Sequence, residues 1–393
     1  MDRSTSVLVT LVVYNAILIG VGLWARGRNR DVQDFFLAGR GLGAWVAAIS
    51  ASASSSSAWT LLGVSGAAYA WGWPAVWIFP STVGGFLINW AWVAPRLQKI
   101  AANEQAVTLS EVVAPATIGS LRKIILRTAA LIIVFCFTFY IASQFEAAGK
   151  AFESVFDMSK RNSILTGAVI VLIYTLLGGF WAVSVTDSVQ GILMAIAALV
   201  LPLVSLAAVG GFGPLFDGLA QIGNTGSPIV AGGVVAVFFV LGLMGIGINY
   251  PGQPLVVNRF MALKDEEALR QGRIIALTWA VLVYSGMLLL GLSARVLFAD
   301  LGDSEQVLFK TATELLPPVV AGVMLAAVLS AIMSTADSQL LVASSAIAYD
   351  WNLADRGKKD GLTGTRRTVV FVLAMATMLA LVWRADIFSR VLF

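Results

Sequence analysis

The stretch "SASASSSSAW" occupies residues 50–59, and apolar segments flank it on both sides. Six of its first eight residues are serine. A single serine in a membrane helix can donate its hydroxyl back to the carbonyl four residues earlier. Four consecutive serines, Ser54 to Ser57, point to every side of a helix, so some would face lipid unless the helix opens there. An opened backbone at this depth is tolerated only against protein or a water-filled cavity, and the run therefore predicts an interrupted membrane helix.

A second interpretation keeps this helix intact. Small side chains recur along it at helical spacing, and such a seam lets two membrane helices approach each other closely. The residues of the seam are Ala47, Ala51, Ser54 and Ala58. The run itself is compatible with both interpretations, so the rest of the chain has to separate them.

The composition of the whole chain is that of a protein embedded in lipid. Of its 393 residues 58% are hydrophobic and 12% are charged, and its mean hydropathy is +0.85. Soluble domains carry about 25% charged residues. The chain has no histidine and one cysteine, Cys136, which excludes Ser-His-Asp catalysis, histidine metal ligands and a disulfide framework. We therefore expect an all-α integral membrane protein surrounded by a lipid bilayer.

About ten apolar segments are long enough to cross the ~30 Å hydrocarbon core of a bilayer. They cover residues 5–25, 43–70, 74–97, 122–151, 162–181, 186–210, 229–252, 272–297, 317–346 and 367–385. The connections after the first, third, seventh and ninth segments, with the adjoining helix ends, hold 18 of the 26 Lys and Arg residues. The positive-inside rule then predicts a multi-pass protein of the plasma (inner) membrane with these connections in the cytoplasm and the N-terminus outside, on the periplasmic side. The net charge of +4 follows from this topology, and no nucleic-acid partner is expected.

A second apolar segment is interrupted like the first. The sequence "GLMGIGINYPGQP" at residues 242–254 contains four glycines and two prolines, which disfavour a continuous helix. It lies about 190 residues after the serine run. Two interrupted helices in corresponding positions are the best sequence indication of a secondary transporter built from inverted repeats. The pair favours an opened helix over the small-residue seam.

Three acidic residues fall within apolar segments or at their edges: Glu146, Asp187 and Asp337. A lone charged carboxylate inside a membrane costs at least ~2.5–3.5 kcal/mol, so each needs a partner or a function. Glu146 precedes Lys150 by four residues, the favourable order for a helical ion pair, and we expect a structural role. Asp187 begins a predicted segment, where a carboxylate would cap a helix and face the positive end of its dipole.

Asp337 lies deep in "LSAIMSTADSQLLVASSA" (residues 329–346), with no Lys or Arg within eight residues. At about 100° per residue, it borders a helix face on which small and hydroxyl side chains gather. That face carries Ala331, Ser334, Thr335 and Ser338. Its oxygens suit an alkali cation or a proton, whereas the alternative is a polar contact between helices. Together with carbonyls freed in the serine run, this face could form a cage of oxygens around Na⁺.

Five stretches of the chain form a recognisable set. They are "DFFLAGRGLG" (34–43), "SASASSSSAW" (50–59), "LLGGFWAVSVTDSVQG" (176–191), "GQPLVVNRFMA" (252–262) and "LSAIMSTADSQLLVASSAI" (329–347). Together they resemble the sodium:solute symporter family, most closely its sodium/proline branch, and the similarity runs along essentially the whole chain.

The resemblance implies a leucine-transporter-type inverted-repeat bundle with one extra N-terminal helix. Residues 1–393 would then form a single transmembrane transporter domain. In it, residues 1–42 are the extra helix and its loop, 43–210 the first repeat and 229–393 an incomplete second repeat. Because the family continues beyond "RADIFSRVLF", the resemblance also implies a C-terminally truncated bundle.

The resemblance also implies binding sites. The main sodium site would use carbonyl oxygens of Ala53, Ser56 and Ala331 and the hydroxyls of Ser334 and Thr335. Some relatives have a second sodium site, whose positions match Asp187, Asp337 and Ser338. The positions on the solute side map to Ser57, Trp59, Tyr140, Tyr250 and Pro254.

Two substitutions separate this chain from the proline-transporting branch. Ser55 stands where that branch has an aspartate in helix two, and Ile246 where it has a tryptophan against the solute. We hypothesise that the carboxylate has moved across the same cavity to Asp337, where relatives often have a hydroxyl. A carboxylate there would strengthen cation binding by Coulomb attraction, and it would also let H⁺ replace Na⁺.

These features predict a symporter with Na⁺ as its coupling ion that imports a small organic solute by alternating access. The solute would be an amino acid such as proline, or a small carboxylate, and the protein would act as a monomer. Two alternatives are a membrane solute sensor or receptor related to the symporters, and a proton-coupled variant. An intramembrane serine enzyme is disfavoured, because the chain has no histidine and no lysine near the serine run to act as a base.

Overall fold

The computed structural model describes residues 3–25, 32–114, 121–156, 158–223, 227–351 and 362–382. Within these ranges the regular elements are all helices, and one isolated bridge pairs Leu42 with Leu263. The long helices are α1 (Arg3–Ala25), α8 (Leu121–Phe156), α9 (Lys160–Val209), α11 (Gly233–Ile248), α13 (Glu266–Leu297), α15 (Pro318–Ser345) and α17 (Leu362–Val382). The shorter helices are α2 (Val32–Leu37), α3 (Ala44–Ser55), α4 (Val64–Trp71), α5 (Ile78–Ile88), α6 (Ala94–Asn103), α7 (Leu109–Val113), α10 (Phe212–Ile222), α12 (Pro254–Ala262) and α14 (Val307–Leu315). Short 3₁₀ or π turns adjoin them, among them η3 (Trp59–Gly63), η5 (Asn89–Val93), η8 (Tyr250–Gly252) and η10 (Ala346–Trp351).

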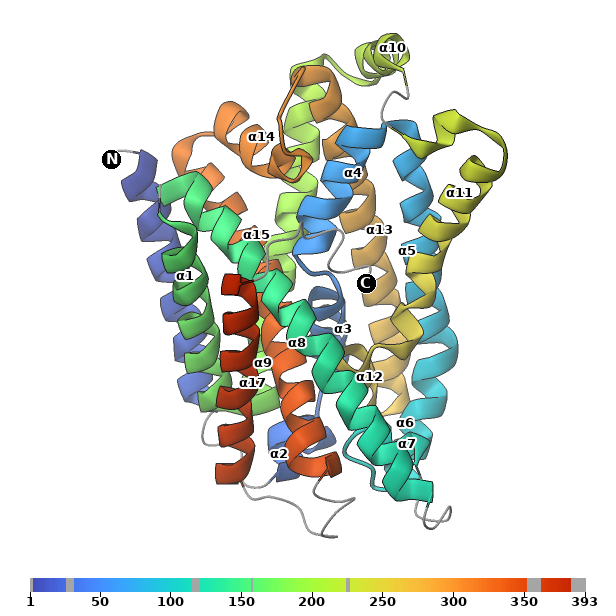
Figure 1. The fold of residues 1–393 in the computed structure, drawn as a ribbon, viewed down its shortest axis with the longest axis vertical. Coiled ribbons are helices and arrows are strands. Elements are labelled where there is room, and N and C mark those ends of the chain that lie inside the picture. Colours follow the sequence, from blue (N-terminus) through green and yellow to red (C-terminus); the bar gives the residue numbers. More distant parts are fainter. Residues whose placement is uncertain are drawn as a thin grey trace.

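The long helices run side by side as one bundle (Figure 1). Seven stretches of the described chain are long and apolar enough to cross a membrane without interruption. The segment predicted at 43–70 is divided between α3 and α4, and the one predicted at 162–181 forms the first part of α9. Large apolar side chains such as Phe238 and Ile248 on α11 are exposed on the outside of the bundle, where lipid would cover them. Each of the ten predicted segments therefore falls on helix, and the expected all-α membrane bundle is confirmed.

Helix two opens inside the serine run. α3 ends at Ser55, and Ser56 leaves the helical region with φ −109° and ψ 78°. Serine hydroxyls bond locally and compete with helical hydrogen bonds, and here the amide of Trp59 donates to Ser57 Oγ at 3.1 Å. The chain returns to a helix through η3 and continues as α4. The predicted interruption is confirmed, so this helix is not the unbroken one that the seam interpretation requires.

The second predicted interruption is present as well. α11 ends at Ile248, η8 follows, and Gln253 is extended with φ −75° and ψ 110°. A residue before proline is disfavoured in the α conformation. Pro254 lacks an amide hydrogen and therefore fits the first position of α12. The two interrupted helices thus each have a pair of halves, α3 with α4 and α11 with α12.

α9 carries two predicted segments with a single break between them. At Gly179, φ is +55° and ψ is −152°, a combination that essentially only glycine adopts. A Cβ at this position would lie 2.7 Å from the ring of Phe35. The sequence predicts a connection at residues 182–185, but these residues are helical and the break comes earlier, at the glycine. As a consequence Asp187 lies about two turns inside the second half of α9.

Short helices mark the two ends of the bundle (Figure 1). α2, α6 and α7 lie at one end, whereas α10, α14 and the N-terminus lie at the other. α2, α7 and the end of α6 belong to connections that the distribution of basic residues assigns to the cytoplasm. The connections predicted for opposite sides of the membrane thus lie at opposite ends of the molecule.

Glycines let neighbouring helices touch backbone to backbone. A Cβ at Gly247 of α11 would lie 2.0 Å from Ser81 O of α5, and one at Gly286 of α13 would lie 1.9 Å from Ala198 O of α9. Close approach at small residues is how helices associate in lipid, where the hydrophobic effect does not drive them together. These contacts fix α11 against α5 and α13 against α9.

Candidate ion and solute site

The opened serine run meets α15 through hydrogen bonds to its last carbonyls. Ser334 donates its hydroxyl to Ala53 O at 3.2 Å, and Thr335 donates to Ser54 O at 2.9 Å. All four residues are buried. Both acceptors lie in the last turn of α3, where the carbonyls lose the amide partners of a continuing helix. The break and the hydroxyl face predicted on residues 329–346 therefore come together in the fold.

Two further residues predicted for the main sodium site, Ala331 and Ser56, make hydrogen bonds to members of this cluster. Ser334 Oγ lies 3.4 Å from Ala331 O, and the amide of Ser56 donates to Ala53 O at 3.1 Å. Neutral carbonyl and hydroxyl oxygens are hard ligands that suit an alkali cation. Over the described ranges, no three Asp, Glu, Cys or His side chains gather in a group that would hold a metal ion. The oxygen set at α3 and α15 thus fits a monovalent ion such as Na⁺.

The second predicted ion position adjoins a side chain that the sequence analysis left in a cytoplasmic connection. Arg259 on α12 is fully buried, with its guanidinium between α3, α9 and α15. Its Nη2 lies 2.7 Å from Asp187 Oδ2 and 2.6 Å from Ser338 Oγ. The same nitrogen donates to Ser54 Oγ at 2.9 Å, and Nε donates to Ser50 Oγ at 3.0 Å. A positive charge therefore already contacts two of the three residues predicted for a second sodium ion.

Asp187 is the partner of this guanidinium and not a helix cap. It lies inside α9, beyond the first turn in which the dipole of a helix end is felt. Its Oδ2 accepts the hydroxyls of Ser50 at 2.8 Å and Ser54 at 2.9 Å, in addition to the ion pair with Arg259. Each serine accepts from the guanidinium and donates to the carboxylate. The capping interpretation is wrong because the second half of α9 begins at the Gly179 break.

The other two acidic residues of the membrane region are also buried. On α15, Asp337 Oδ1 accepts from Ser338 Oγ at 3.2 Å. Glu146 on α8 forms an ion pair with Lys160 at the start of α9. The side chain of its predicted partner, Lys150, lies outside the described residues. Glu146 thus has an ion-pair contact with the next helix, and the predicted pair with Lys150 stays a prediction.

Hydroxyls and aromatic rings lie beside the two breaks. The hydroxyls of Ser57 and Tyr140 are 3.0 Å apart, and Tyr140 belongs to α8. The Tyr250 hydroxyl in the other break shares a hydrogen bond with the Tyr284 hydroxyl of α13. Tyr284 in turn lies 3.3 Å from Thr60 Oγ1, just after the first break. The hydrogen bonds of Tyr250 and Tyr284 therefore link the two interrupted helices, and Tyr140 connects the first break to α8.

The helix that resumes after the first break begins with amide groups held by side chains. The amide of Ala58 donates to Gln144 Oε1 of α8 at 3.2 Å, and that of Trp59 donates to Ser57 Oγ. Both residues are buried, Trp59 to 5% exposure. Amides at a helix start favour a negative charge, so this end could receive a carboxylate.

Three further predicted solute residues, Ser55, Ile246 and Pro254, make none of these hydrogen bonds. Ser55 turns its hydroxyl back to Ser52 O of its own helix, at 3.0 Å. Ile246 on α11 is partly buried against the apolar core. Pro254 begins α12 and fixes the end of the second break. The Ser55 hydroxyl is used within its own helix, and the other two side chains are apolar, so none of the three adds to the polar lining of the site.

The sequence analysis missed Arg259, Tyr284, Gln144 and Ser50. Tyr284 and Gln144 are polar residues in apolar segments, a signal that could have identified them. Arg259 gives a weaker signal, because a basic residue just after a predicted segment is typical of a cytoplasmic loop. Only the return of α12 into the bundle brings it to Asp187.

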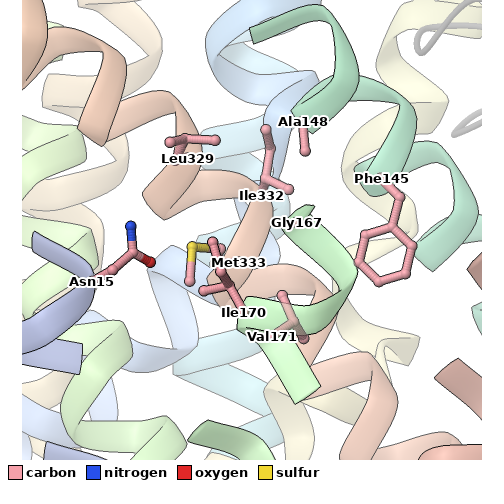
Figure 2. Close-up of a pocket in the computed structure, with 9 residues that line it drawn as sticks. All are labelled: Asn15, Phe145, Ala148, Gly167, Ile170, Val171, Leu329, Ile332 and Met333. Atoms are coloured by element: carbon pink, nitrogen blue, oxygen red, sulfur yellow. The ribbon is translucent and has the colours of Figure 1, made fainter. Parts of the chain in front are cut away.

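A separate cavity lies behind α15 and does not belong to this site (Figure 2). It is small, with room for about one water molecule, about 10 Å³, and is lined by Asn15, Phe145, Ala148, Gly167, Ile170, Val171, Leu329, Ile332 and Met333. Its α15 residues lie on the face opposite Ser334 and Thr335 at helical spacing. Asn15 is the one polar residue among those nine, so the cavity offers little to an ion.

Comparison with known proteins agrees with this architecture. A model of the sodium:solute symporter family matches residues 35–391. The sodium/proline symporter of Escherichia coli (strain K12) is 36% identical over 392 residues, which cover 96% of this chain and 77% of that protein. The osmoregulated proline transporter of Bacillus subtilis (strain 168) is 34% identical over 354 residues, 88% of this chain and 71% of that protein.

A solved structure gives the fold. The substrate-bound, outward-open state of a Na⁺-coupled sialic acid symporter superposes with a TM-score of 0.82 at 17% identity. The match covers 97% of this chain and 82% of the other. At this identity the likeness bears on the fold alone, and it confirms the leucine-transporter-type bundle. With the family match over most of its length, the chain belongs to the sodium:solute symporter family, whose members are transporters and not enzymes.

Proposed function

We propose that this protein couples the entry of Na⁺ to the uptake of a small organic solute, with proline as the first candidate. The observation that carries the proposal is the contact between α3 and α15, in which Ser334 and Thr335 donate to carbonyls of an interrupted helix. This contact gathers buried, neutral oxygens at the end of a helix, directly before the break. An ion held there would tie two helices of different repeats together.

The ion would be held by the carbonyls of Ala53, Ser56 and Ala331 and the hydroxyls of Ser334 and Thr335. When bound, Na⁺ would supply a positive charge that binds all five oxygens at once and replaces their mutual hydrogen bonds. The carbonyls of α3 would then keep one position relative to α15. Because the solute residues follow directly along the chain at Ser57 and Trp59, an ordered first break favours solute binding.

The solute would bind between the two breaks. Its carboxylate would accept from the amides of Ala58 and Trp59, in place of the side chains that now hold them. Its apolar part would lie against the rings of Tyr140 and Tyr250. Proline fits this description, because it joins a carboxylate to a compact apolar ring, and both bacterial relatives are named for proline. Ile246 in place of a tryptophan leaves room for other small amino acids and carboxylates.

Transport would proceed by alternating access around the two breaks. Residues 43–210 and 229–393 would form the two inverted repeats, and the breaks at residues 56–57 and 249–253 would absorb the change in backbone angles. Ion and solute would raise each other's affinity by the same factor.

A second candidate is coupling to protons, favoured by the buried carboxylate of Asp337. Its position beside the hydroxyl face would let a proton neutralise the site in place of Na⁺. The two candidates differ in which gradient drives uptake, so one assay separates them.

The test is uptake of radiolabelled proline by proteoliposomes under an inward Na⁺ gradient, with a proton gradient as the comparison. We expect Na⁺-dependent uptake. Ser334→Ala and Thr335→Ala should each raise the Na⁺ concentration for half-maximal uptake about tenfold or more, because losing one buried oxygen costs ~1–3 kcal/mol.

The matched control is Ser344→Ala, which removes a buried hydroxyl from the same helix. Among the described residues, this hydroxyl bonds to Leu340 O of its own helix, at 2.6 Å, and not to α3. It should leave the Na⁺ dependence unchanged. Equal effects of all three substitutions would contradict the proposed ion site. Binding of solute without uptake would indicate a sensor instead of a symporter.

A further inference from the structure

We propose that the surface where α6 ends and α13 begins binds the headgroup of an anionic lipid, with Arg96, Arg270 and Arg273 as its cationic groups. The two helices meet there, because Lys99 on α6 forms an ion pair with Glu266 on α13 at 2.8 Å. They belong to the end of the bundle with α6 and α7, which is predicted to face the cytoplasm (Figure 1). This surface lies on the outside of the bundle, so the inference does not depend on the proposed ion and solute sites.

Exposed side chains along α5 and α6 change from apolar to aromatic to basic. Leu87 and Ile88 are 49% and 45% exposed, Trp92 follows at 60%, and Arg96 is exposed one turn later. On the outside of a membrane protein apolar side chains face the lipid tails, and tryptophan favours the boundary between the tails and the headgroups. Arg96, one turn beyond that boundary, is therefore at the level of the lipid phosphates.

α13 runs in the opposite direction and repeats these layers in reverse. Its first two residues, Glu266 and Glu267, are exposed and acidic, and Arg270 follows about one turn later. Ile274, another turn on, is 65% exposed and belongs to the apolar layer. Arg270 and the half-buried Arg273 thus lie between side chains suited to water and side chains suited to lipid tails.

Two of the guanidinium groups are fixed on the backbone of one turn. Nε of Arg273 donates to Trp90 O at 3.2 Å, and Nη1 of Arg96 donates to Trp92 O at 2.9 Å. In the π turn η5 a carbonyl pairs with the amide five residues later, and Pro95 has no amide hydrogen to offer Trp90 O. The Arg96 guanidinium also lies 5.2 Å from the centre of the Trp92 ring, a cation–π contact. Both arginines are therefore positioned before any ligand arrives.

The charge of this surface is not neutralised by the protein. Over the described ranges, none of the three arginines forms an ion pair with a carboxylate, and the neighbouring acidic groups have other contacts. Glu266 pairs with Lys99, and Glu267 accepts from Gln271 at 2.7 Å. Asp265 caps the start of α13. Guanidinium groups bind phosphate oxygens in pairs, and basic pockets between membrane helices bind anionic headgroups. The partner that fits is a lipid with a net negative headgroup.

The experiment measures lipid binding to the purified full chain in detergent by native mass spectrometry. The probes are phosphatidylglycerol, which is anionic, and phosphatidylcholine with the same acyl chains, which is zwitterionic. We expect the wild type to prefer phosphatidylglycerol by about tenfold or more, because each arginine near a headgroup is worth about fivefold in affinity. Arg96→Gln with Arg273→Gln should remove most of this preference and leave phosphatidylcholine binding unchanged.

The matched control is Arg366→Gln with Arg367→Gln. It removes the same charge from two exposed arginines at the start of α17, and it should keep the preference. An equal loss in both double variants would show general attraction to basic surfaces and would overturn the site. A lower melting temperature with unchanged lipid preference would mean that the arginines only hold carbonyls, and would overturn it as well.

Two further measurements complete the test. If the first double variant does not fold, Arg96→Gln decides, because this side chain is exposed: a preference lowered about fivefold supports the site, and an unchanged one overturns it. Inorganic phosphate at the concentration of the lipid should not displace phosphatidylglycerol, and displacement would overturn a lipid as the occupant. None of these measurements involves Na⁺ or solute, so their failure would leave the proposed function standing.

Discussion

Asp337 is the residue on which the choice of coupling ion depends. It is buried on α15, two residues after Thr335 and next to Ser338, whose hydroxyl it accepts. Ser55, at the position where the proline branch has an aspartate, turns its hydroxyl into its own helix. A carboxylate on α15 can act on an ion at the α3 contact through its charge, without being a ligand.

We expect Asp337→Asn to raise the Na⁺ concentration for half-maximal uptake by tenfold or more. Two unit charges about 8 Å apart attract by about 2 kcal/mol at an effective dielectric constant of ~20, and asparagine removes that attraction at nearly constant size. Sodium-dependent uptake in proteoliposomes measures the change. An unchanged Na⁺ affinity would sink the idea that the carboxylate has moved from helix two to α15.

Among the elements, the two interrupted helices are supported by neighbours that approach them closely. α11 lies against α5 with Gly247 over Ser81, whose Oγ accepts from the Gly247 amide at 2.8 Å. Asn89, in the turn after α5, donates to Tyr250 O in the second break at 3.1 Å. The ring of Phe86 packs on Tyr250 at 4.8 Å between centroids. α5 thus acts as a fixed wall against which the second break is placed.

Gly247→Ala should therefore destabilise the protein, by about 1–3 kcal/mol as for other overpacked cores. The new Cβ would lie 2.0 Å from a backbone carbonyl, which cannot move like a flexible side chain. Thermal unfolding of the purified protein in detergent measures the loss. Gly245→Ala, on the same helix with open space around its Cβ, is the control and should be neutral or stabilise by up to ~1 kcal/mol. Equal melting temperatures for both variants would show that α5 and α11 do not touch here.

At the scale of the whole molecule, the distribution of basic residues predicts which end of the helix bundle faces the cytoplasm. The end with α6 and α7 is the one predicted to face the cytoplasm, and the end with α10 and α14 the one predicted to face outward (Figure 1). Arg259 is an exception to the count, because it is buried in the bundle. The remaining basic residues of its connection still follow α12, so the predicted orientation does not change.

This orientation can be measured by cysteine labelling. In a background that lacks Cys136, a membrane-impermeant maleimide should label Ala299→Cys, just after α13, in intact right-side-out vesicles. Ala102→Cys, near the end of α6, should react only after the membrane is opened. Both alanines are exposed on the protein surface, so a difference in labelling reports the side of the membrane and not burial in the protein. The reverse labelling pattern would place the N-terminus in the cytoplasm.

The amino-acid sequence fixes those features that depend on neighbours along the chain. Lengths of apolar segments, the serine run at 50–59 and the glycines and prolines at 242–254 all act within a few turns, and they predict the helices and both breaks correctly. The hydroxyl face of α15 is likewise a matter of spacing along one helix. The sequence predicts the connection before Asp187 at residues 182–185, whereas the helix breaks at Gly179. Either of the adjacent glycines at 178 and 179 permits such a turn. The close approach of the Phe35 ring, which leaves no room for a Cβ, explains why the break needs a glycine at 179.

Contacts between distant segments depend on the assembled bundle. Arg259 reaches Asp187 across 72 residues and Ser50 across 209, and no periodicity links such positions. A charged side chain is tolerated in the interior only when every partner arrives together, and it is the packing of α3, α9, α12 and α15 that brings them there. Which oxygens remain for a mobile ion, and which already serve a fixed charge, is therefore decided by the fold.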